Sequence, residues 1–343
     1  MIIIILAGGS GTRLWPLSTP DFPKHLLSIN GNKRSLLQLT YLRAKKISNE
    51  IYIVSDKSHI RHVKEQIENL DDSHFIVEPS RRGTANCMIF ALSQINNKNQ
   101  DETIAFIHSD HYIRDEVGFN HTFKVAESAS KKYNNIILIG AEPDYPATGF
   151  GYIKKGNLVS DEPYIYKVDS FKEKPDFITA KQYLNSGKYS WNCGYFLAKL
   201  STFENAMKEY SPNLYSNFLK LKITMTNQLE ETYKSFKSST IDYELIEKDK
   251  ELMVIQASFD WMDLGSFSDL HKAVGSDENN NYIKGDVEID EVENAFIQNE
   301  TNLPMAVIGL DNIVVISTNN GILVTRKDLS QKVGEISKRI NNK

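Results

Sequence analysis

The chain has 343 residues, of which 41% are hydrophobic and 24% are charged, and its formal net charge is −4. A chain of this length exceeds one minimal domain, so we expect one large α/β domain with a smaller appendage. The slightly acidic balance and the lack of a Lys- or Arg-rich block argue against a nucleic-acid partner. No stretch approaches the ~18 apolar residues that cross a bilayer, so we expect no membrane association. An anionic substrate would then be bound by local cations.

The chain contains two cysteines, Cys87 and Cys193, whose separation fits no metal-binding motif. So few cysteines without a disulfide pattern are typical of proteins in a reducing compartment. The apolar run at residues 2–6 is too short for a signal peptide and has no basic segment before it. These observations predict a cytoplasmic protein.

Short apolar runs alternate with helical patterns from the first residues to about residue 141. The expected elements, in order, are a strand at 2–6, a helix at 36–47, a strand at 50–55, a helix at 59–69, a strand at 74–78, a helix at 84–95, a strand at 103–108, a helix at 119–133 and a strand at 135–141. Continuous apolar strands that alternate with helices are typical of a parallel sheet covered on both faces. The sequence therefore predicts an α/β fold, Rossmann-like, with a mixed, mostly parallel sheet flanked by helices.

The second half of the chain changes character. Residues 142–200 hold strand-like runs with polar motifs, and we expect an insertion there that forms a lid or a second half of a site. Helical segments are expected between residues 201 and 249, followed by a strand at 251–258. After Gly275 short β runs continue until a helix expected at 329–340. We therefore place a domain boundary between a domain at 1–275 and a small domain at 276–343.

The first predicted strand runs into ILAGGSGTRLWPLSTPDFPK, residues 5–24. In an open parallel sheet, ligands bind at the carboxyl ends of the strands, where this loop begins. The small residues from Ala7 to Gly11 let backbone N–H groups approach an anion closely. Arg13 and Lys24 can add charge-assisted hydrogen bonds to phosphate oxygens. The alternative is an ordinary tight turn after a strand, and the loop alone favours neither.

Two better-known phosphate motifs do not fit this loop. A Walker loop has a glycine and then a lysine at the fifth and sixth residues after its first glycine, whereas this chain has Arg13 and Leu14 at those offsets from Gly8. A dinucleotide fingerprint has a third glycine where this chain has Leu14. The sequence therefore argues against a P-loop kinase and against a dinucleotide-dependent dehydrogenase.

Asp110 follows the predicted strand in FIHSDH, residues 106–111. A carboxylate at the end of a strand is well placed to hold Mg²⁺, although it could instead cap the next turn. His108 and His111 could suggest zinc, but no further ligand lies at a suitable spacing.

Several motifs together resemble the sugar-1-phosphate nucleotidylyltransferase family. They are LAGGSGTRLWPLS at 6–18, FIVEPSRRGTAN at 75–86, FIHSDH at 106–111, TGFGYI at 148–153, FKEKP at 171–175, WNCGYF at 191–196 and FDWMDLGSF at 259–267. Trp15 and Pro16 are similar to the branch that uses GTP and mannose 1-phosphate. The resemblance implies transfer of GMP from GTP to α-D-mannose 1-phosphate, which gives GDP-mannose and pyrophosphate.

The resemblance covers residues 1 to about 270 and implies that residues 1–275 form a nucleotidyltransferase catalytic domain. The tail at 276–343 is similar to the family's small, left-handed β-helix-like domain, here with a terminal helix. That domain often mediates dimer contacts, so the resemblance implies a homodimer.

The resemblance also implies a set of site residues. Mg²⁺ would be held by Asp110 and Asp263, the latter being the aspartate of the W-x-D-x-G pattern. The nucleotide would be bound by Leu6, Ala7, Gly8, Gly9, Gly11, Thr12, Arg13, Lys24, Glu78, Thr84, Ser109 and Asp110. The sugar phosphate would be bound by Gly151, Tyr152, Glu173, Lys174, Asn192 and Gly194. The predicted catalytic residues are Arg13, Lys24, Asp110 and Lys174.

Three of these assignments depend strongly on the resemblance. Glu173 and Lys174 taken alone would be an exposed ion pair, whereas the resemblance implies contacts to sugar hydroxyls and to the sugar phosphate. Glu78 would accept the guanine N1–H and N2–H₂ donors. The segment IDYELIE, residues 241–247, also matches the family, and we expect it to be a helix beneath the site in which Asp242 and Glu244 have no assigned role.

Two departures from the family pattern leave the substrates open. Residues 83–86 read Gly-Thr-Ala-Asn where the guanylyltransferases have Asn-Thr-Ala-Pro, and His25 stands where the family usually has glutamine. The alternative is therefore a related enzyme for another nucleoside triphosphate or another sugar 1-phosphate, such as a heptose 1-phosphate. A non-catalytic homologue that only binds nucleotide sugars is a further alternative, but it should have lost a metal aspartate or a phosphate-binding cation.

Overall fold

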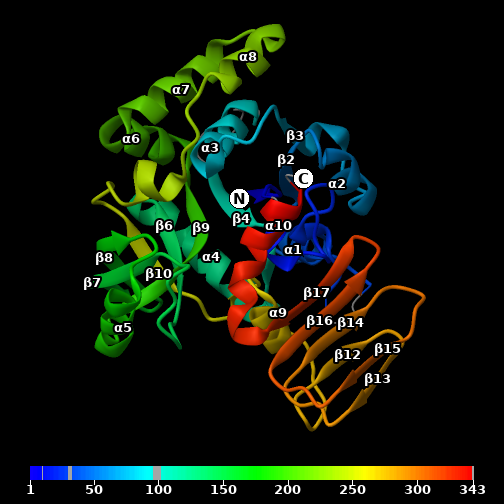
Figure 1. Ribbon diagram of the computed structural model, residues 1–343. Coiled ribbons are helices and arrows are strands. Elements are labelled where there is room, and N and C mark those ends of the chain that lie inside the picture. The colour runs from blue at the N-terminus through cyan, green and yellow to red at the C-terminus, as the bar shows by residue number, and fades with distance from the viewer. Residues whose placement is uncertain (10, 30–32, 96–101, 342–343) are drawn as a thin grey trace. The chain divides into compact units, whose positions relative to one another are not determined.

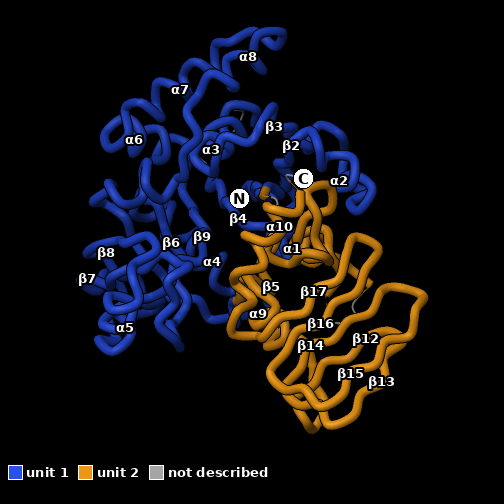
Figure 2. Tube along the Cα trace, viewed as in Figure 1, with its two compact units in different colours: residues 1–8, 41–108, 113–261 blue, residues 9–40, 109–112, 262–343 orange. Residues whose placement is uncertain are grey.

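The computed structural model describes residues 1–9, 11–29, 33–95 and 102–341. Among the helices in these ranges, none combines the length and the apolar run that crossing a bilayer requires. The chain forms two compact units (Figure 2). Unit 1 comprises residues 1–8, 41–108 and 113–261, and unit 2 comprises residues 9–40, 109–112 and 262–343. The predicted domain boundary after residue 275 is a different division of the chain and stays a prediction.

Unit 1 is built on a nine-stranded sheet with the order β3-β2-β1-β4-β9-β6-β10-β8-β7. The strands are β1 (Ile2–Leu6), β2 (Glu50–Asp56), β3 (Phe75–Glu78), β4 (Thr103–His108), β6 (Ile137–Ala141), β7 (Tyr152–Asp161), β8 (Tyr164–Lys172), β9 (Tyr189–Lys199) and β10 (Met253–Gln256). The pairings show that β8 and β9 run against the other strands. The predicted mixed, mostly parallel sheet is therefore confirmed.

The helices of unit 1 cover this sheet (Figure 1). They are α2 (Ile60–Gln66), α3 (Gly83–Gln94), α4 (Glu116–Tyr133), α5 (Phe177–Ser186), α6 (Leu200–Tyr210), α7 (Pro212–Ile223) and α8 (Leu229–Lys234), while α1 (Leu36–Lys45) begins in unit 2. β1 is buried along its whole length because isoleucines on both faces meet apolar layers. α3 is buried from Ala85 to Leu92, since it packs between the sheet and α7.

The expected insertion at residues 142–200 is not a separate lid. β9 lies between β4 and β6 in the middle of the main sheet and pairs antiparallel with both. Its second half, around Phe196 to Ala198, is wholly buried, so it belongs to the core of unit 1. The polar motif in the first half of β9 suggested a surface segment. The apolar run that follows has to be buried on both faces, which places the strand inside the sheet.

Unit 2 contains a short β-helix-like arrangement and two helices. A four-stranded sheet has the order β12-β14-β16-β17, and two further pairs are β13–β15 and β5–β11. The elements are β5 (His111–Tyr112), β11 (Met262–Asp263), α9 (Phe267–Ala273), β12 (Tyr282–Lys284), β13 (Val287–Asp290), β14 (Phe296–Asn299), β15 (Met305–Ile308), β16 (Ile313–Thr318), β17 (Gly321–Arg326) and α10 (Val333–Asn341). β12, β14 and β16 are parallel, as are β13 and β15, which is the stacking of a β-helix. The expected β-helix-like tail is confirmed.

The core of unit 2 joins the two ends of the chain. We call residues 9–24 the opening loop; its Ser10 lies outside the described residues. Leu14 and Trp15 of this loop pack in one apolar cluster with Phe267 of α9, Val314 of β16 and Val333 of α10. Burial of such side chains contributes ~1.5 to 3 kcal/mol each. The opening loop is therefore a part of the core that the C-terminal segment completes.

Candidate active site

Asp110 and Asp263 are brought together by the pairing of two very short strands. β5 pairs antiparallel with β11, so that Asp263 lies opposite His111, the residue after Asp110. The Lys24 ammonium contacts both carboxylates, at 3.0 Å from Asp110 Oδ2 and 2.8 Å from Asp263 Oδ1. Because both oxygens reach the same nitrogen atom, the two carboxylates are close enough to share one cation.

The charges of this group stabilise one another. Burial lowers the pKa of Lys24, but the charges of Asp110 and Asp263 outweigh it and raise the pKa above its ordinary value. Burial raises the pKa of Asp263, and the Lys24 charge outweighs this effect and lowers it. Lys24 and Asp263 are therefore charged at neutral pH.

The two aspartates fit a magnesium ion. Their side chains stay 32% and 22% exposed, whereas the Lys24 side chain is 6% exposed, so solvent reaches the carboxylates. Among the described residues, no cluster of three or more His, Cys, Asp or Glu side chains could hold a metal. Mg²⁺ is often bound by one or two carboxylates together with water and substrate phosphates. A site with two carboxylates agrees with that habit.

The opening loop presents its backbone to this pair. Gly11 has φ +55°, and a Cβ there would lie 2.5 Å from the Lys24 backbone nitrogen, so only glycine fits. A Cβ on Gly9 would meet nothing within 4 Å. Thr12 begins a single 3-10 turn that ends at Leu14. Gly11 thus brings the opening loop against Lys24, and anion binding by the loop stays a prediction.

Arg13 extends from this turn as an exposed cation. Among the described residues it forms no ion pair with a carboxylate. Its Nη1 lies 3.1 Å from the position that a Cβ on Gly265 would occupy. The guanidinium is therefore available for an anionic ligand.

The other predicted nucleotide residues near the loop are buried. Leu6 ends β1 and Ala7 donates its N–H to the Val54 carbonyl at 2.8 Å. Ser109, directly before Asp110, is fully buried, and its hydroxyl has no hydrogen-bond partner among the described residues. The Ser109 hydroxyl could therefore still form a hydrogen bond with a ligand.

Glu78 and Thr84 are engaged inside unit 1. Glu78 accepts hydrogen bonds from the Tyr233 hydroxyl at 2.6 Å and from the Arg82 N–H at 3.3 Å. Burial raises the pKa of Glu78. The Thr84 hydroxyl accepts from the Ile241 N–H at 3.0 Å. Both side chains therefore hold the protein's own groups, and this geometry favours a structural role over recognition of guanine.

The departure from the family pattern at residues 83–86 has a structural cause. Gly83 has φ +81°, and a Cβ there would lie 2.1 Å from the Ser239 carbonyl oxygen. The Asn86 amide donates to the carbonyls of Arg82 at 2.8 Å and Lys237 at 2.9 Å. Gly83 and Asn86 thus hold the start of α3 against the segment before the π-helical turn at Asp242–Ile246, which is a packing role.

Three predicted sugar-site residues meet at the ends of β7 and β9 in unit 1. A Cβ on Gly151 would lie 2.6 Å from Glu173 Oε2 and 3.3 Å from Asn192 Cβ. The Asn192 N–H donates to the Gly151 carbonyl at 2.8 Å. Glu173 and Asn192 are each less than a tenth exposed. The glycine thus creates the space in which a carboxylate and an amide come together.

Glu173 and Lys174 lie beyond the end of β8, in a loop. Lys174 has φ +43°, and its N–H donates to the Phe150 carbonyl at 3.2 Å. Its ammonium lies 3.0 Å from Glu173 Oε1 and its side chain is 57% exposed. This contact places both side chains on the same side of the loop, and their roles at a sugar phosphate stay predictions.

Asp242 is a member of this group that the sequence analysis left without a role. The Asn192 amide donates to Asp242 Oδ1 at 3.1 Å, and the Glu173 N–H donates to Glu247 Oε1 at 2.9 Å. Burial and then the charge of Glu173 raise the pKa of Asp242 to about 7. The expected helix is a π-helical turn, Asp242–Ile246. Glu244 instead contacts Ser211 and Lys248.

Gly194 and Tyr152 flank this group in different ways. Gly194 has φ +69°, donates its N–H to Asn192 Oδ1 at 3.0 Å, and would place a Cβ 2.8 Å from His108 Nε2. Tyr152 is fully buried, with its ring 5.4 Å from that of Tyr183. Its side chain belongs to the core, so only its backbone could face a ligand.

An aromatic cluster beside these polar groups was not predicted from the sequence. The Phe150 ring lies 5.2 Å from that of Trp191 and 5.1 Å from that of Trp261, and Tyr145 lies 4.9 Å from Trp191. Small-molecule sites often combine aromatic walls with a few polar groups. These rings come from three separate sequence segments, so no local pattern could reveal them.

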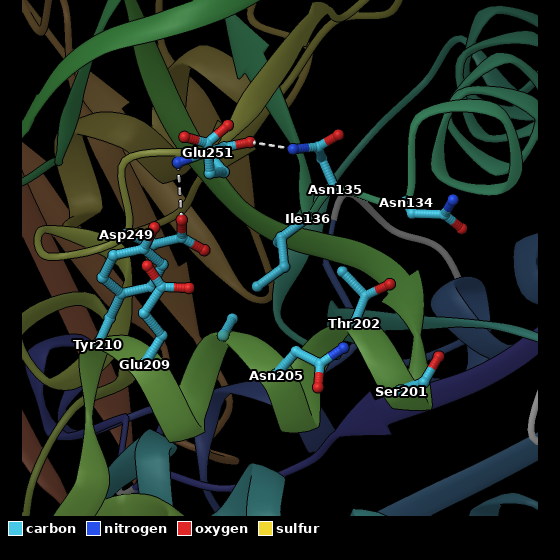
Figure 3. Close-up of a pocket in the computed structure, with 11 residues that line it drawn as sticks. Asn134, Asn135, Ile136, Ser201, Thr202, Asn205, Glu209, Tyr210, Asp249 and Glu251 are labelled. Atoms are coloured by element: carbon cyan, nitrogen blue, oxygen red, sulfur yellow. Dashed lines mark hydrogen bonds between the residues drawn. The ribbon is translucent and has the colours of Figure 1, made fainter.

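A cavity of about 440 Å³ in unit 1 lies away from these residues (Figure 3). It is lined by residues before β6 and β10 and by one face of α6, among them Asn135, Asn205, Asp249 and Glu251. The Asn135 amide donates to the Glu251 carbonyl at 2.6 Å. Gly151 and Asn192 lie at the other end of β6, opposite the cavity, where ligands of parallel sheets bind. The cavity is thus not part of the predicted site.

Comparisons with known proteins show the family of the chain. The family described as Nucleotidyl transferase matches residues 2–280, and the family described as MannoseP isomerase/GMP-like beta-helix domain matches residues 285–340. The mannose-1-phosphate guanylyltransferase RfbM of Salmonella typhimurium is 35% identical over 97% of this chain and 71% of its own length. The xanthan biosynthesis protein XanB of Xanthomonas campestris is 33% identical over 99% of this chain and 73% of its own. A crystal structure from Thermus thermophilus, described as mannose-1-phosphate geranyltransferase, is 25% identical with a TM-score of 0.89 and 99% of each chain covered. The chain therefore belongs to the nucleotidyl transferase family.

Proposed function

We propose that this protein transfers GMP from GTP to α-D-mannose 1-phosphate, giving GDP-mannose and pyrophosphate. The observation that carries the proposal is the contact of Lys24 with both Asp110 and Asp263 behind a glycine-rich loop. Relatives named mannose-1-phosphate guanylyltransferase and XanB, matched over nearly the whole chain, support the choice of substrates. The product would supply mannosyl units for a polysaccharide or glycan.

The reaction needs no protein nucleophile. An oxygen of the sugar phosphate attacks the α-phosphorus of GTP, a new P–O bond forms, and the bond to pyrophosphate breaks. The attacking phosphate is already ionised, so the protein has to position the reactants and neutralise charge. Mg²⁺ held by Asp110 and Asp263 would supply part of that neutralisation.

The cations of the chain take distinct parts. Arg13, exposed and free of carboxylates among the described residues, binds the departing pyrophosphate. Lys24 holds the two aspartates together, and an ammonium has three N–H donors, so the third can reach the α-phosphate. Lys174 orients the phosphate of the sugar, and its pairing with Glu173 sets the direction of its side chain.

The sugar is recognised by polar groups of unit 1. The Glu173 carboxylate and the Asn192 amide accept and donate hydrogen bonds to hydroxyls, and Asp242 fixes the Asn192 amide. Heptose and mannose phosphates share most of these polar groups, so a heptose 1-phosphate is the competing substrate.

We also propose that the enzyme is a cytoplasmic homodimer. Cys87 and Cys193 are free and buried, which suits a reducing compartment. Ile322 and Val324 on one face of β17 are 67% and 64% exposed, and Ile308 of β15 is 66% exposed. Such apolar exposure is typical of a protein interface. Sedimentation analysis should give the mass of two chains, and a monomer at micromolar concentration would contradict the proposal.

The decisive experiment is a panel of four nucleoside triphosphates and several sugar 1-phosphates, assayed by pyrophosphate release with and without Mg²⁺. We expect the highest kcat/KM for GTP with mannose 1-phosphate and no turnover after removal of Mg²⁺. Glu78→Gln should leave the ranking of the nucleotides unchanged, because that carboxylate is bonded to Tyr233. Preference for another triphosphate, or nucleotide binding without release, would overturn the proposal.

A further inference from the structure

The C-terminal segment of unit 2 contacts the opening loop at three residues, Arg13, Trp15 and Pro16. The segment in question is residues 313–341, which hold β16, β17 and α10. The first contact involves α10, and the other two involve different residues of the β16–β17 turn.

The first contact joins α10 to the stem of Arg13. A Cβ on Gly334 would lie 2.9 Å from Arg13 Cγ and 3.8 Å from its Cα. Gly334 is buried in the first turn of α10. The stem of the arginine therefore packs against a helix surface that has no side chain at this point. Any larger residue there would push Arg13 away, because the clash is near its backbone rather than at its flexible end.

The second contact joins the β16–β17 turn, at Gly321, the first residue of β17, to Trp15. A Cβ on Gly321 would lie 2.5 Å from Trp15 Cζ2 and 2.9 Å from Cη2, and Gly321 has φ +149°. The indole is 7% exposed. Since an aromatic ring cannot bend, an added methyl group would displace the whole ring and the backbone that carries it.

The third contact joins the same turn to Pro16. The Thr318 hydroxyl and the Asn320 amide both donate to the Pro16 carbonyl, at 3.4 and 3.5 Å. Two weak hydrogen bonds to one carbonyl add a polar anchor to the two packing contacts. The backbone that follows Arg13 is thus held by packing and by hydrogen bonds.

We propose that residues 313–341 position the pyrophosphate-binding arginine, with Gly334 and Gly321 as positioning residues for the reaction. The proposal rests on the function proposed above, because it gives Arg13 a place in the reaction. A displacement of about 1 Å at a reacting group can cost up to ~10²-fold in rate. The C-terminal segment therefore acts on catalysis without contacting a substrate.

The test compares Gly334→Ala with Gly275→Ala. A Cβ on Gly275 would meet nothing within 4 Å, so it is the matched control in unit 2. In the reverse reaction, Gly334→Ala should raise the KM for pyrophosphate about tenfold or more while the KM for GDP-mannose stays unchanged. Gly275→Ala should change neither. Equal KM values for pyrophosphate in the two variants would overturn the proposal.

A second variant pair keeps the test informative if Gly334→Ala does not fold. Gly321→Ala should show the same selective loss, and Trp15→Phe should restore it, since phenylalanine lacks the ring atoms that clash. Additive effects of the two substitutions would contradict the proposal.

Calorimetric titration with pyrophosphate and Mg²⁺ separates this proposal from the proposed function. If the wild-type protein binds no pyrophosphate, the proposed function fails. The other informative outcome has the wild-type protein and Gly334→Ala binding pyrophosphate equally well while Arg13→Ala does not bind it. In that case the positioning role of residues 313–341 fails and the proposed function stands.

Discussion

The group around Lys24 in unit 2 and the group around Glu173 in unit 1, which we propose to bind phosphates and the sugar, differ in their electrostatics. In unit 2 a buried lysine lies between two aspartates and lowers the pKa of Asp263. In unit 1 Glu173, Asp242 and Glu247 lie close together with Lys174, whose side chain is largely exposed, and the pKa of Asp242 rises to about 7. The unit 2 group holds one lysine for two aspartates and so keeps one negative charge, which suits a cation. The unit 1 group keeps several carboxylate acceptors, which suit hydroxyl donors.

The largest expected effect comes from removing one aspartate of the Lys24 group. Asp110→Asn should lower kcat by ~10²- to 10³-fold, by analogy with loss of an electrostatic group that acts in the transition state. Steady-state kinetics at saturating Mg²⁺ measure this, with the fold checked by circular dichroism. The matched control is Asp260→Asn, because Asp260 pairs with Arg114 and lies in the same sequence motif as Asp263. That control should lower thermal stability and keep turnover; near-normal turnover of Asp110→Asn would remove the assigned role.

An intermediate effect concerns the surplus acceptors. Glu173→Gln should raise the KM for the sugar phosphate by ~10-fold or more, because one hydroxyl acceptor is lost. The KM for GTP should stay within about twofold, which distinguishes local sugar recognition from general misfolding. Glu244→Gln is the control, since Glu244 faces Ser211 and Lys248. An equal rise of both KM values would show that the Glu173 group does not bind the sugar phosphate separately from GTP.

The smallest effect is a pH dependence of stability that belongs to unit 1. In the folded protein Asp242 keeps its proton up to about pH 7, whereas in the unfolded chain it loses the proton as pH rises from about 4. The stabilisation that the bound Asp242 proton gives to the folded state is fully present below pH ~4 and declines as pH rises towards 7. Thermal melts of wild type and Asp242→Asn between about pH 4 and 8 should therefore show the variant gaining relative stability at the higher pH. A constant difference would contradict the raised pKa.

Much of the fold could be predicted because its signals are local. The buried isoleucines of β1 and the alternation up to Ala141 indicated strands and helices close to their observed bounds. The place of β9 between β4 and β6 could not be predicted, since its partners are decided by burial on both faces and not by its own pattern.

The site was predicted unevenly for the same reason. The glycines and cations of the opening loop lie in one motif, and Asp110 and Asp263 follow strands, so their types and spacing were informative. The contact of Lys24 with both aspartates depends on the β5–β11 pairing. Each of these strands has two residues, which is too short for a sequence pattern to predict the pairing. Glu78 was assigned to guanine from its motif, but its partner Tyr233 is remote in sequence. Asp242 likewise gains its role from Asn192 and Glu173.

The discontinuous make-up of unit 2 has a consequence for biosynthesis. The opening loop leaves the ribosome early, but its packing partners in β16, β17 and α10 are translated much later. A nascent chain can pair the strands of unit 1 while Arg13 and Trp15 still lack their supports. A chain that has not yet reached α10 would then lack the support for Arg13 that we propose.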